Sequence, residues 1–127
     1  MKVYLMKKVF HSELVGKTLI VIPQGAAMDF PYQQVHIDSN ATLRLLSDPS
    51  TKNVLIDLGD VEYLDSIIIG SLIRMLQKIK TTGGQAMFCS ATEQMQEILK
   101  SIKIGSLWPL HPDREVALAA MGKAEGC

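Results

Sequence analysis

The chain has 127 residues, of which 47% are apolar and 20% charged, a composition typical of a globular protein that can bury a core without disulfides. Thirteen basic and thirteen acidic residues cancel, so no overall field would attract nucleic acid or an anionic membrane. No apolar stretch approaches the roughly 18 to 20 residues that a membrane-spanning helix needs.

The first part of the chain predicts a β-hairpin, a loop and a helix. Residues 3–13 can form an extended strand, and the apolar run TLIVI at 18–22 is typical of a second one. Turn residues at 15–17 favour a tight connection between them. The stretch 24–34 carries turn residues and little period, which indicates an exposed loop. A helix with a weak apolar face is predicted over about 35–46.

Residues 54–80 form the segment around which the chain is organised. The β-branched apolar run at 54–58 predicts a buried strand. A helix is predicted over 67–80, and Asp65 or Ser66 can serve as its N-cap, because either side chain can accept a bond from an unpaired amide of the first turn. On a helical wheel, one arc is apolar and is predicted to face a core: Met75, Ile68, Ile79, Leu72, Leu76, Ile69 and Ile73.

The opposite arc of this helix is polar and is predicted to face water. Its members are Ser66, Gly70, Ser71, Arg74, Gln77 and Lys78. Ile67 is the one large apolar side chain on this arc, in the first turn. Two interpretations are open. Either a neighbouring loop covers Ile67, or Ser66, Ile67 and Gly70 form a small surface that another protein contacts.

The remainder of the chain predicts two short strands and two helices. A buried strand at 85–89 precedes Ser90 and Glu93, which have the spacing of a capping box. The helix that follows has a one-faced apolar period, and Gly105 ends it. Residues 107–110 favour a short edge strand.

Strands that alternate with helices after an opening hairpin predict an α/β fold. We expect a mixed sheet of four to five strands with about four helices, in which the central helix joins two parallel strands. Pro112 suits the first turn of a last helix that is predicted to end near Met121. A single domain is expected over residues 1–127, with its core at about 3–121 and a frayed tail at 122–127.

Cysteine usage and the first residues predict a cytoplasmic location. Cys89 ends a predicted buried strand and Cys127 is the last residue, a placement that indicates free thiols in a reducing compartment. The opening residues contain several lysines and lack the apolar block of a signal peptide.

Residues able to support catalysis or bind a metal are few. His11, His36 and His111 share no metal-ligand spacing with the cysteines. The turn before the central helix carries four acids: Asp57, Asp60, Glu62 and Asp65. These acids are able to hold Mg²⁺, but such groups more often solvate a turn and favour the positive end of the next helix. Ser66 lacks a G-x-S-x-G context, and no histidine is placed by sequence to activate it. We expect no catalytic residue, no metal and no cofactor.

Three sequence features together resemble a known family. They are the turn VEYLDS before the central helix, the Gly-Gly pair before the next strand, and the stretch SATEQMQEILKSIKIGSLWPL. Over residues 52–121 the chain resembles a STAS domain, and over the first 50 residues it does so by its order of elements. This domain is found in bacterial anti-sigma-factor antagonists and on sulphate-type anion transporters. A chain without a predicted membrane span resembles the antagonist branch.

The resemblance implies a phosphorylation site at the start of the central helix. In the family, a partner kinase phosphorylates the serine that directly follows an aspartate, and these positions are Ser66 and Asp65 here. The family pattern continues with Ser or Thr, Gly, Leu and Gly, whereas residues 67–69 are all isoleucine here and only Gly70 is kept. A second family acid, in the loop after the second strand, corresponds to Asp29.

The function that the resemblance implies is that of a non-enzymatic bacterial regulatory module. It would bind an anti-sigma factor or serine-protein kinase through the N-terminal end of the central helix, under the control of Ser66 phosphorylation. The implied partner-binding residues are Asp65, Ser66, Ile67, Gly70, Arg74 and Asp29. A phosphatase would be a further partner, nucleic acid and membrane are not expected, and the oligomeric state is left open.

Three other functions are compatible with the sequence. The first is a ligand-sensing module for a nucleotide or small anion, near residues 24–34 and Ser66. The second is a binding domain without the phosphorylation switch, because residues 67–69 depart from the family pattern. The third is a small hydrolase that uses Ser66, which requires a histidine within hydrogen-bond reach.

Overall fold

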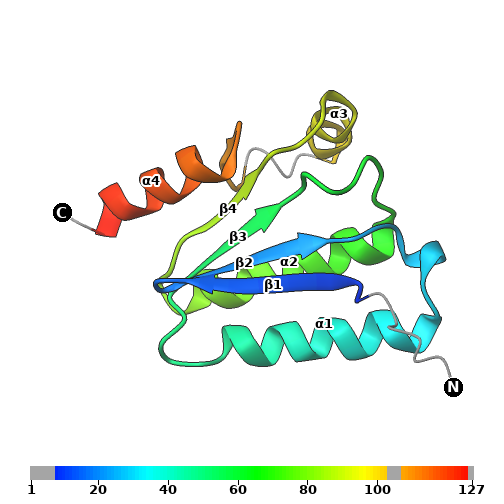
Figure 1. Ribbon diagram of the computed structural model, residues 1–127, viewed down its shortest axis with the longest axis horizontal. Helices are drawn as coiled ribbons and strands as arrows, with labels where there is room; N and C mark the ends of the chain where they lie inside the picture. The colour runs from blue at the N-terminus through cyan, green and yellow to red at the C-terminus, as the bar shows by residue number, and fades with distance from the viewer. Residues whose placement is uncertain (1–7, 103–106, 126–127) are drawn as a thin grey trace, which may run out of the picture.

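The structure is a computed structural model that describes residues 8–102 and 107–125 (Figure 1). Its elements are β1 (Phe10–Val15), β2 (Thr18–Pro23), the 3₁₀ helix η1 (Ala27–Asp29), α1 (Tyr32–Leu46), β3 (Asn53–Asp57), α2 (Ser66–Thr81), β4 (Ala86–Cys89), α3 (Glu93–Ser101), β5 (Leu110–His111) and α4 (Arg114–Glu125). Residues 3–7 of the first predicted strand, the predicted helix stop at Gly105, and residues 126–127 of the predicted tail lie outside the described residues.

The strands form one five-stranded sheet in the order β1-β2-β3-β4-β5. β1 and β2 are antiparallel, with Val15 paired to Thr18 across a tight turn in which Gly16 has a φ of 60°. Glycine reaches this left-handed conformation without the steric cost that a side chain imposes. The pairings β2–β3, β3–β4 and β4–β5 are all parallel. The predicted α/β fold is therefore confirmed, with its mixed sheet, opening hairpin and parallel pair around the central helix.

The sheet separates two apolar clusters. All five residues of β3 are buried, as expected for a central parallel strand. Val54 and Ile56 belong to the larger cluster, which α1 and α2 cover, whereas Leu55 points to the other face, where Ala117 and Met121 of α4 pack. α1 and α2 contact each other, and Figure 1 shows α2 behind the strands, α1 below them and α4 beyond β4 at the upper left.

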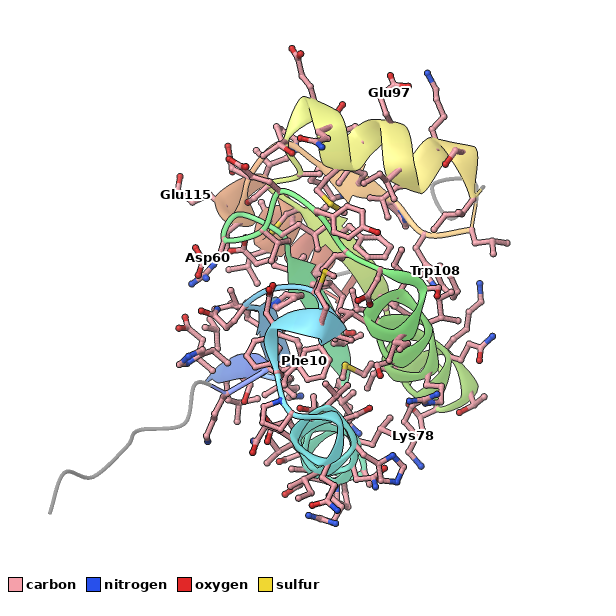
Figure 2. The ribbon with its side chains drawn as sticks, turned by 90° about the vertical axis from the view of Figure 1, so that its right-hand side faces the viewer. Phe10, Asp60, Lys78, Glu97, Trp108 and Glu115 are labelled. Carbon is pink, nitrogen blue, oxygen red and sulfur yellow. The ribbon has the colours of Figure 1, made fainter. Side chains whose placement is uncertain are left out.

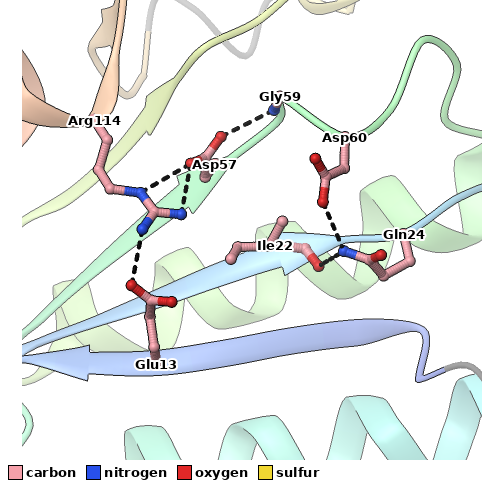
Figure 3. Close-up of polar contacts among 7 residues, drawn as sticks. All are labelled: Glu13, Ile22, Gln24, Asp57, Gly59, Asp60 and Arg114. Carbon is pink, nitrogen blue, oxygen red and sulfur yellow. Dashed lines mark hydrogen bonds and ion pairs between the residues drawn. The ribbon is translucent and has the colours of Figure 1, made fainter.

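An ion-pair network joins α4 to the sheet (Figure 3). Arg114 donates through Nε and Nη2 to Asp57 Oδ2, at 3.0 Å each, and through Nη1 to Glu13 Oε1 at 2.8 Å. Although desolvation lowers the pKa of Arg114, the hydrogen bond and charge of Asp57 outweigh it and raise that pKa. Asp57 Oδ1 accepts from the Gly59 amide at 2.9 Å. Both carboxylate oxygens of Asp57 are thus engaged in contacts that hold the fold together. The described residues contain no group of three or more His, Cys, Asp or Glu able to hold a metal ion.

Cys89 lies beneath α4, on the same face of the sheet as Leu55. Desolvation by burial raises the pKa of its thiol to about 11. The thiol is therefore neutral near pH 7, as befits a small core residue rather than a nucleophile.

The N-terminus of α3 differs from the capping box that the sequence predicts. Ser90 has a φ of 66°, in the left-handed region, whereas an N-cap residue needs an extended backbone. Thr92 is extended instead, and its side chain accepts a hydrogen bond from the Met95 amide at 3.1 Å. The predicted Ser90–Glu93 pair is wrong, because Ser90 has a left-handed backbone and its amide still donates to the His111 carbonyl of β5 at 3.1 Å, before the helix begins.

Other boundaries differ from the predictions by a few residues. α1 begins at Tyr32, earlier than predicted, because the amide of Val35 already donates to the Pro31 carbonyl and forms the first turn there. α4 continues to Glu125 beyond the predicted end at Met121. The single glycine in its last turn costs only about 1 kcal/mol against the helix formers around it, so it does not end the helix.

β5 occupies only two residues at the sheet edge rather than the predicted stretch 107–110. Trp108, just before it, is buried in the larger cluster. Within the described ranges, no helix has both the length and the apolar character that crossing a membrane requires.

Candidate functional site

Asp65 holds two segments of backbone together at the start of α2. Its Oδ1 accepts a hydrogen bond from the Ile68 amide at 3.1 Å and so caps the helix. Its Oδ2 accepts from the Ala27 amide at 2.8 Å, which ties η1 to the same point. Of the two predicted caps, Asp65 is the one used, and Ser66 is free to be the first helical residue. Both carboxylate oxygens are therefore engaged inside the domain.

Asp29 shapes the loop that carries η1. Its Oδ2 accepts from the Ala26 amide at 3.2 Å. A Cβ at Gly25 would lie 2.9 Å from that oxygen, so glycine is what allows the close approach. Asp29 lines a separate hollow of about 450 Å³, together with Asp60 and Glu62. The residue is thus near the candidate site but is not part of its wall.

An open pocket of about 500 Å³ lies between η1, α1 and the first turns of α2. Figure 2 views α1 and α2 nearly end on, with η1 close to both. The residues that line this pocket are Ala27, Met28, Phe30, Val35, His36, Ser39, Asp65, Ser66, Ile67, Gly70, Ser71 and Arg74. Five of the six predicted partner-binding residues therefore meet in one pocket, and Asp29 is the exception.

Ile67 is exposed at this pocket rather than covered. Its side chain is 54% exposed, and Met28 on the facing segment is 81% exposed. The interpretation in which a neighbouring loop buries Ile67 is therefore wrong: η1 is bonded to Asp65 nearby, but it leaves Ile67 exposed. Exposed apolar residues are common on protein surfaces, but these two line one pocket together, which is the arrangement that favours contact with a partner.

Ser66 is exposed in the first turn of α2. Among the described residues its hydroxyl has no hydrogen-bond partner, and so no histidine is bonded to it, although His36 lines the same pocket. The condition for a hydrolase that uses Ser66 is not met within this part of the chain.

Ser71 corrects the helical-wheel prediction. It was expected on the water-facing arc, but it is 1% exposed because α1 packs over that part of α2. Its hydroxyl lies 3.2 Å from the hydroxyl of Ser39. Arg74 Nη2 donates to Ser71 Oγ at 3.1 Å and to Ser39 Oγ at 3.4 Å. These contacts fix the Arg74 side chain at the end of the pocket away from Asp65.

Sequence reasoning identified only part of the opposite wall of the pocket: the alternative of a ligand site near residues 24–34 and Ser66 includes Met28 and Phe30 but none of the residues from α1. That wall consists of Met28, Phe30, Val35, His36 and Ser39. They precede α2 by about 30 residues, so no local pattern relates them to Ser66. The only signal is the presence of two large apolar residues, Met28 and Phe30, in a stretch otherwise rich in turn residues.

Comparison with known proteins gives a consistent result. The family model for the STAS domain matches residues 12–117. BtrV of Bordetella bronchiseptica, provisionally named an anti-sigma factor antagonist, is 23% identical over 106 residues, which cover 84% of this chain and 88% of BtrV.

Solved structures show the same fold. A Thermotoga maritima protein, provisionally described as an anti-sigma factor antagonist, has a TM-score of 0.75 and 18% identity, over 88% of this chain and 93% of that one. The anti-sigma factor antagonist SpoIIAA in its unphosphorylated form has a TM-score of 0.72 and 12% identity, over 93% of this chain and 97% of that one.

Proposed function

This chain belongs to the STAS domain family, and from that premise we propose that it is a binding module of the anti-sigma-factor-antagonist type. It has no catalytic role of its own and binds an anti-sigma factor or serine-protein kinase in the cytoplasm. The observation that carries the proposal is the convergence of five predicted partner-binding residues on one open pocket, with Ile67 and Met28 exposed beside it. A concave, partly apolar site with a few convergent polar groups is the usual form of a recognition site.

Phosphorylation of Ser66 is the proposed control. The partner kinase transfers a phosphoryl group to the exposed hydroxyl, which adds about −1.5 to −2 charges next to Asp65. Within the free domain, the amides at the start of α2 partly accommodate this charge. A partner packed over Ile67 would instead face a dianion that has lost its water, and it would dissociate. A phosphatase would restore the binding form.

Replacement of Ser66 tests this control. We expect Ser66→Asp to weaken binding of the purified anti-sigma factor at least about tenfold in isothermal titration calorimetry, because like charge and desolvation oppose docking. Ser66→Ala should bind almost as wild type, since it adds no charge. Ser12→Asp, an exposed serine on β1 outside the pocket, is the matched control. If Ser66→Asp binds the anti-sigma factor as tightly as wild type, control by phosphorylation is contradicted, and the chain is a binding domain without that switch.

Gly70 offers a test that separates binding from stability. A Cβ built on Gly70 meets no atom within 4 Å, so Gly70→Ala should fit the domain without strain. The change removes helix-interior glycine and is expected to stabilise the domain by about 0.5–1 kcal/mol. The added methyl group enters the pocket, and the affinity for the partner should fall.

The matched variant for this test is Gly84→Ala, whose Cβ would collide with the Lys52 carbonyl. It should lower the melting temperature in thermal denaturation followed by circular dichroism, whereas Gly70→Ala should raise it. A Gly70→Ala protein that is more stable and binds as tightly as wild type would contradict a docking role for the pocket.

A ligand-sensing module is the second candidate, because the pocket volume of about 500 Å³ lies within the range of small-molecule sites. A thermal shift produced by a nucleotide or small anion without any protein partner would favour it.

A further inference from the structure

Arg74 is a cation without an acidic neighbour. Among the described residues, the ion pairs are those of Arg114 with Glu13 and Asp57, none of which lines the pocket. Within this part of the chain, the guanidinium of Arg74 donates to the hydroxyls of Ser71 and Ser39 and to no other group. Hydroxyl groups orient a guanidinium but do not neutralise its charge. Arg74 therefore presents an oriented and uncompensated positive charge at the end of the pocket.

The route to this charge is open because of Gly70. Ser66, Gly70 and Arg74 occupy positions i, i+4 and i+8 of α2, so they lie on one stripe of the helix and all line the pocket. A Cβ at Gly70 would have no side chain of another segment within 4 Å. The position between Ser66 and Arg74 on this stripe therefore carries no side chain that would block a group extending along the helix toward Arg74.

Among the described residues that line the pocket, none is an acid able to form an ion pair with Arg74. Asp65 is the one acidic side chain in this set, and its two oxygens accept hydrogen bonds from the amides of Ala27 and Ile68. Asp65 precedes Arg74 by nine residues in sequence, which is about 13 Å along a helix axis. The end of the pocket near Arg74 is thus positive. Besides Asp65 and Arg74, His36 is the remaining titratable side chain among the described lining residues.

We infer that Arg74 receives a carboxylate, and that an aspartate or glutamate side chain of the protein partner supplies it. This inference rests on the proposed function of the same pocket. A planar guanidinium forms two parallel hydrogen bonds with a carboxylate, which gives both strength and direction. An apolar residue of the partner, next to this acid, packs against Ile67 and Met28. Arg74 is accordingly the residue that selects an acidic anchor.

This arrangement also explains how a phosphate on Ser66 would act at a distance. Ser66 and Arg74 are eight residues apart, about 12 Å along the helix, and they open on one pocket. A phosphate on Ser66 lies in the path that the partner's acid follows to Arg74. The phosphate and the partner's acid carry charges of the same sign, so they repel each other where they share the pocket.

A small-molecule probe tests the chemistry of the pocket directly. We would titrate 4-phenylbutyrate, and its uncharged analogue 4-phenylbutan-1-ol, into ¹⁵N-labelled protein and follow the amide signals of Gly70 and Ser71. The carboxylate should bind about ten times more tightly than the alcohol, as expected for hydrogen bonds to charged groups, and Arg74→Gln should abolish this preference. Arg44→Gln, an exposed arginine on α1 outside the pocket, should leave it unchanged. Equal binding of the two compounds would overturn the inference.

A second measurement uses the purified anti-sigma factor. Arg74→Glu should bind the anti-sigma factor at least about tenfold more weakly than wild type, and Arg74→Lys should lose less of this affinity. The control Arg44→Glu should bind the anti-sigma factor as tightly as wild type. Reversal of the contacting acid on the partner should restore binding to Arg74→Glu. Full binding by Arg74→Glu, together with loss of binding by Ile67→Asp, would overturn the inference and leave the proposed function intact. Carboxylate-selective binding that depends on Arg74, in a chain that fails to bind the anti-sigma factor, would support the carboxylate site and contradict the proposed function.

Discussion

Ile67→Asp is expected to weaken partner binding by at least about a hundredfold while the melting temperature stays within about 2 °C of wild type. Ile67 is 54% exposed in the free domain, so its replacement leaves no cavity in the core. An aspartate in the first turn of α2 also interacts favourably with the positive end of the helix, which preserves stability. In the complex, the same carboxylate would be buried without a partner, and its desolvation costs several kcal/mol.

Titration calorimetry and thermal denaturation of the same preparation measure the two quantities. The control is Ile37→Asp, because Ile37 is 57% exposed on α1 and does not line the pocket. It should bind as wild type. If Ile67→Asp instead lowers the melting temperature strongly, Ile67 contributes to the core and the docking role assigned to it is wrong.

Asp65→Ala is expected to destabilise the domain by about 2–4 kcal/mol. Loss of the cap on the Ile68 amide accounts for about 1 kcal/mol of this. The Ala27 amide, left without an acceptor in a partly buried position, adds about 1–3 kcal/mol. The expected fall in melting temperature is roughly 10 °C for a domain of this size. Because η1 is then released from the start of α2, the pocket should lose its shape and the partner its binding site.

Urea denaturation gives the free energy of unfolding for this comparison. Asp65→Asn keeps one acceptor oxygen and should lie between wild type and Asp65→Ala. The matched control is Asp60→Ala, because Asp60 is exposed and accepts one exposed hydrogen bond, from Gln24 at 3.2 Å. It should change the free energy of unfolding by less than about 0.5 kcal/mol. An effect of Asp65→Ala as small as that of Asp60→Ala would contradict the double anchoring role.

The sequence alone was sufficient for the order and type of most elements. A strand period of two and a helix period of 3.6 are local properties, so residues 54–58 and the core arc of α2 could be assigned without tertiary information. The same locality explains why Ile67 could be recognised as an apolar residue on a polar arc. The resemblance to the STAS family rested on motifs within and after this segment, and it identified the family correctly.

Contacts between segments far apart in the sequence decided which polar residues are buried, which residue caps α2 and where α3 begins. Ser71 is buried because α1 packs over α2, and no periodicity within α2 contains that information. Asp65 rather than Ser66 became the cap because it also binds the Ala27 amide. The left-handed backbone of Ser90 and its bond to the His111 carbonyl of β5 set the start of α3 later than the sequence predicts.

The pocket shows most clearly which features the local sequence determines and which depend on tertiary contacts. The sequence by itself determined that Ser66, Ile67, Gly70 and Arg74 share one stripe of a helix, because helical spacing is a property of the local chain. Only the tertiary structure decided that this stripe faces a second wall from η1 and α1, and that Asp29 stands outside it. The reason is that the wall forms where η1 and α1 pack beside α2 on one face of the sheet, and this packing joins residues some thirty positions apart that no helical or strand period relates.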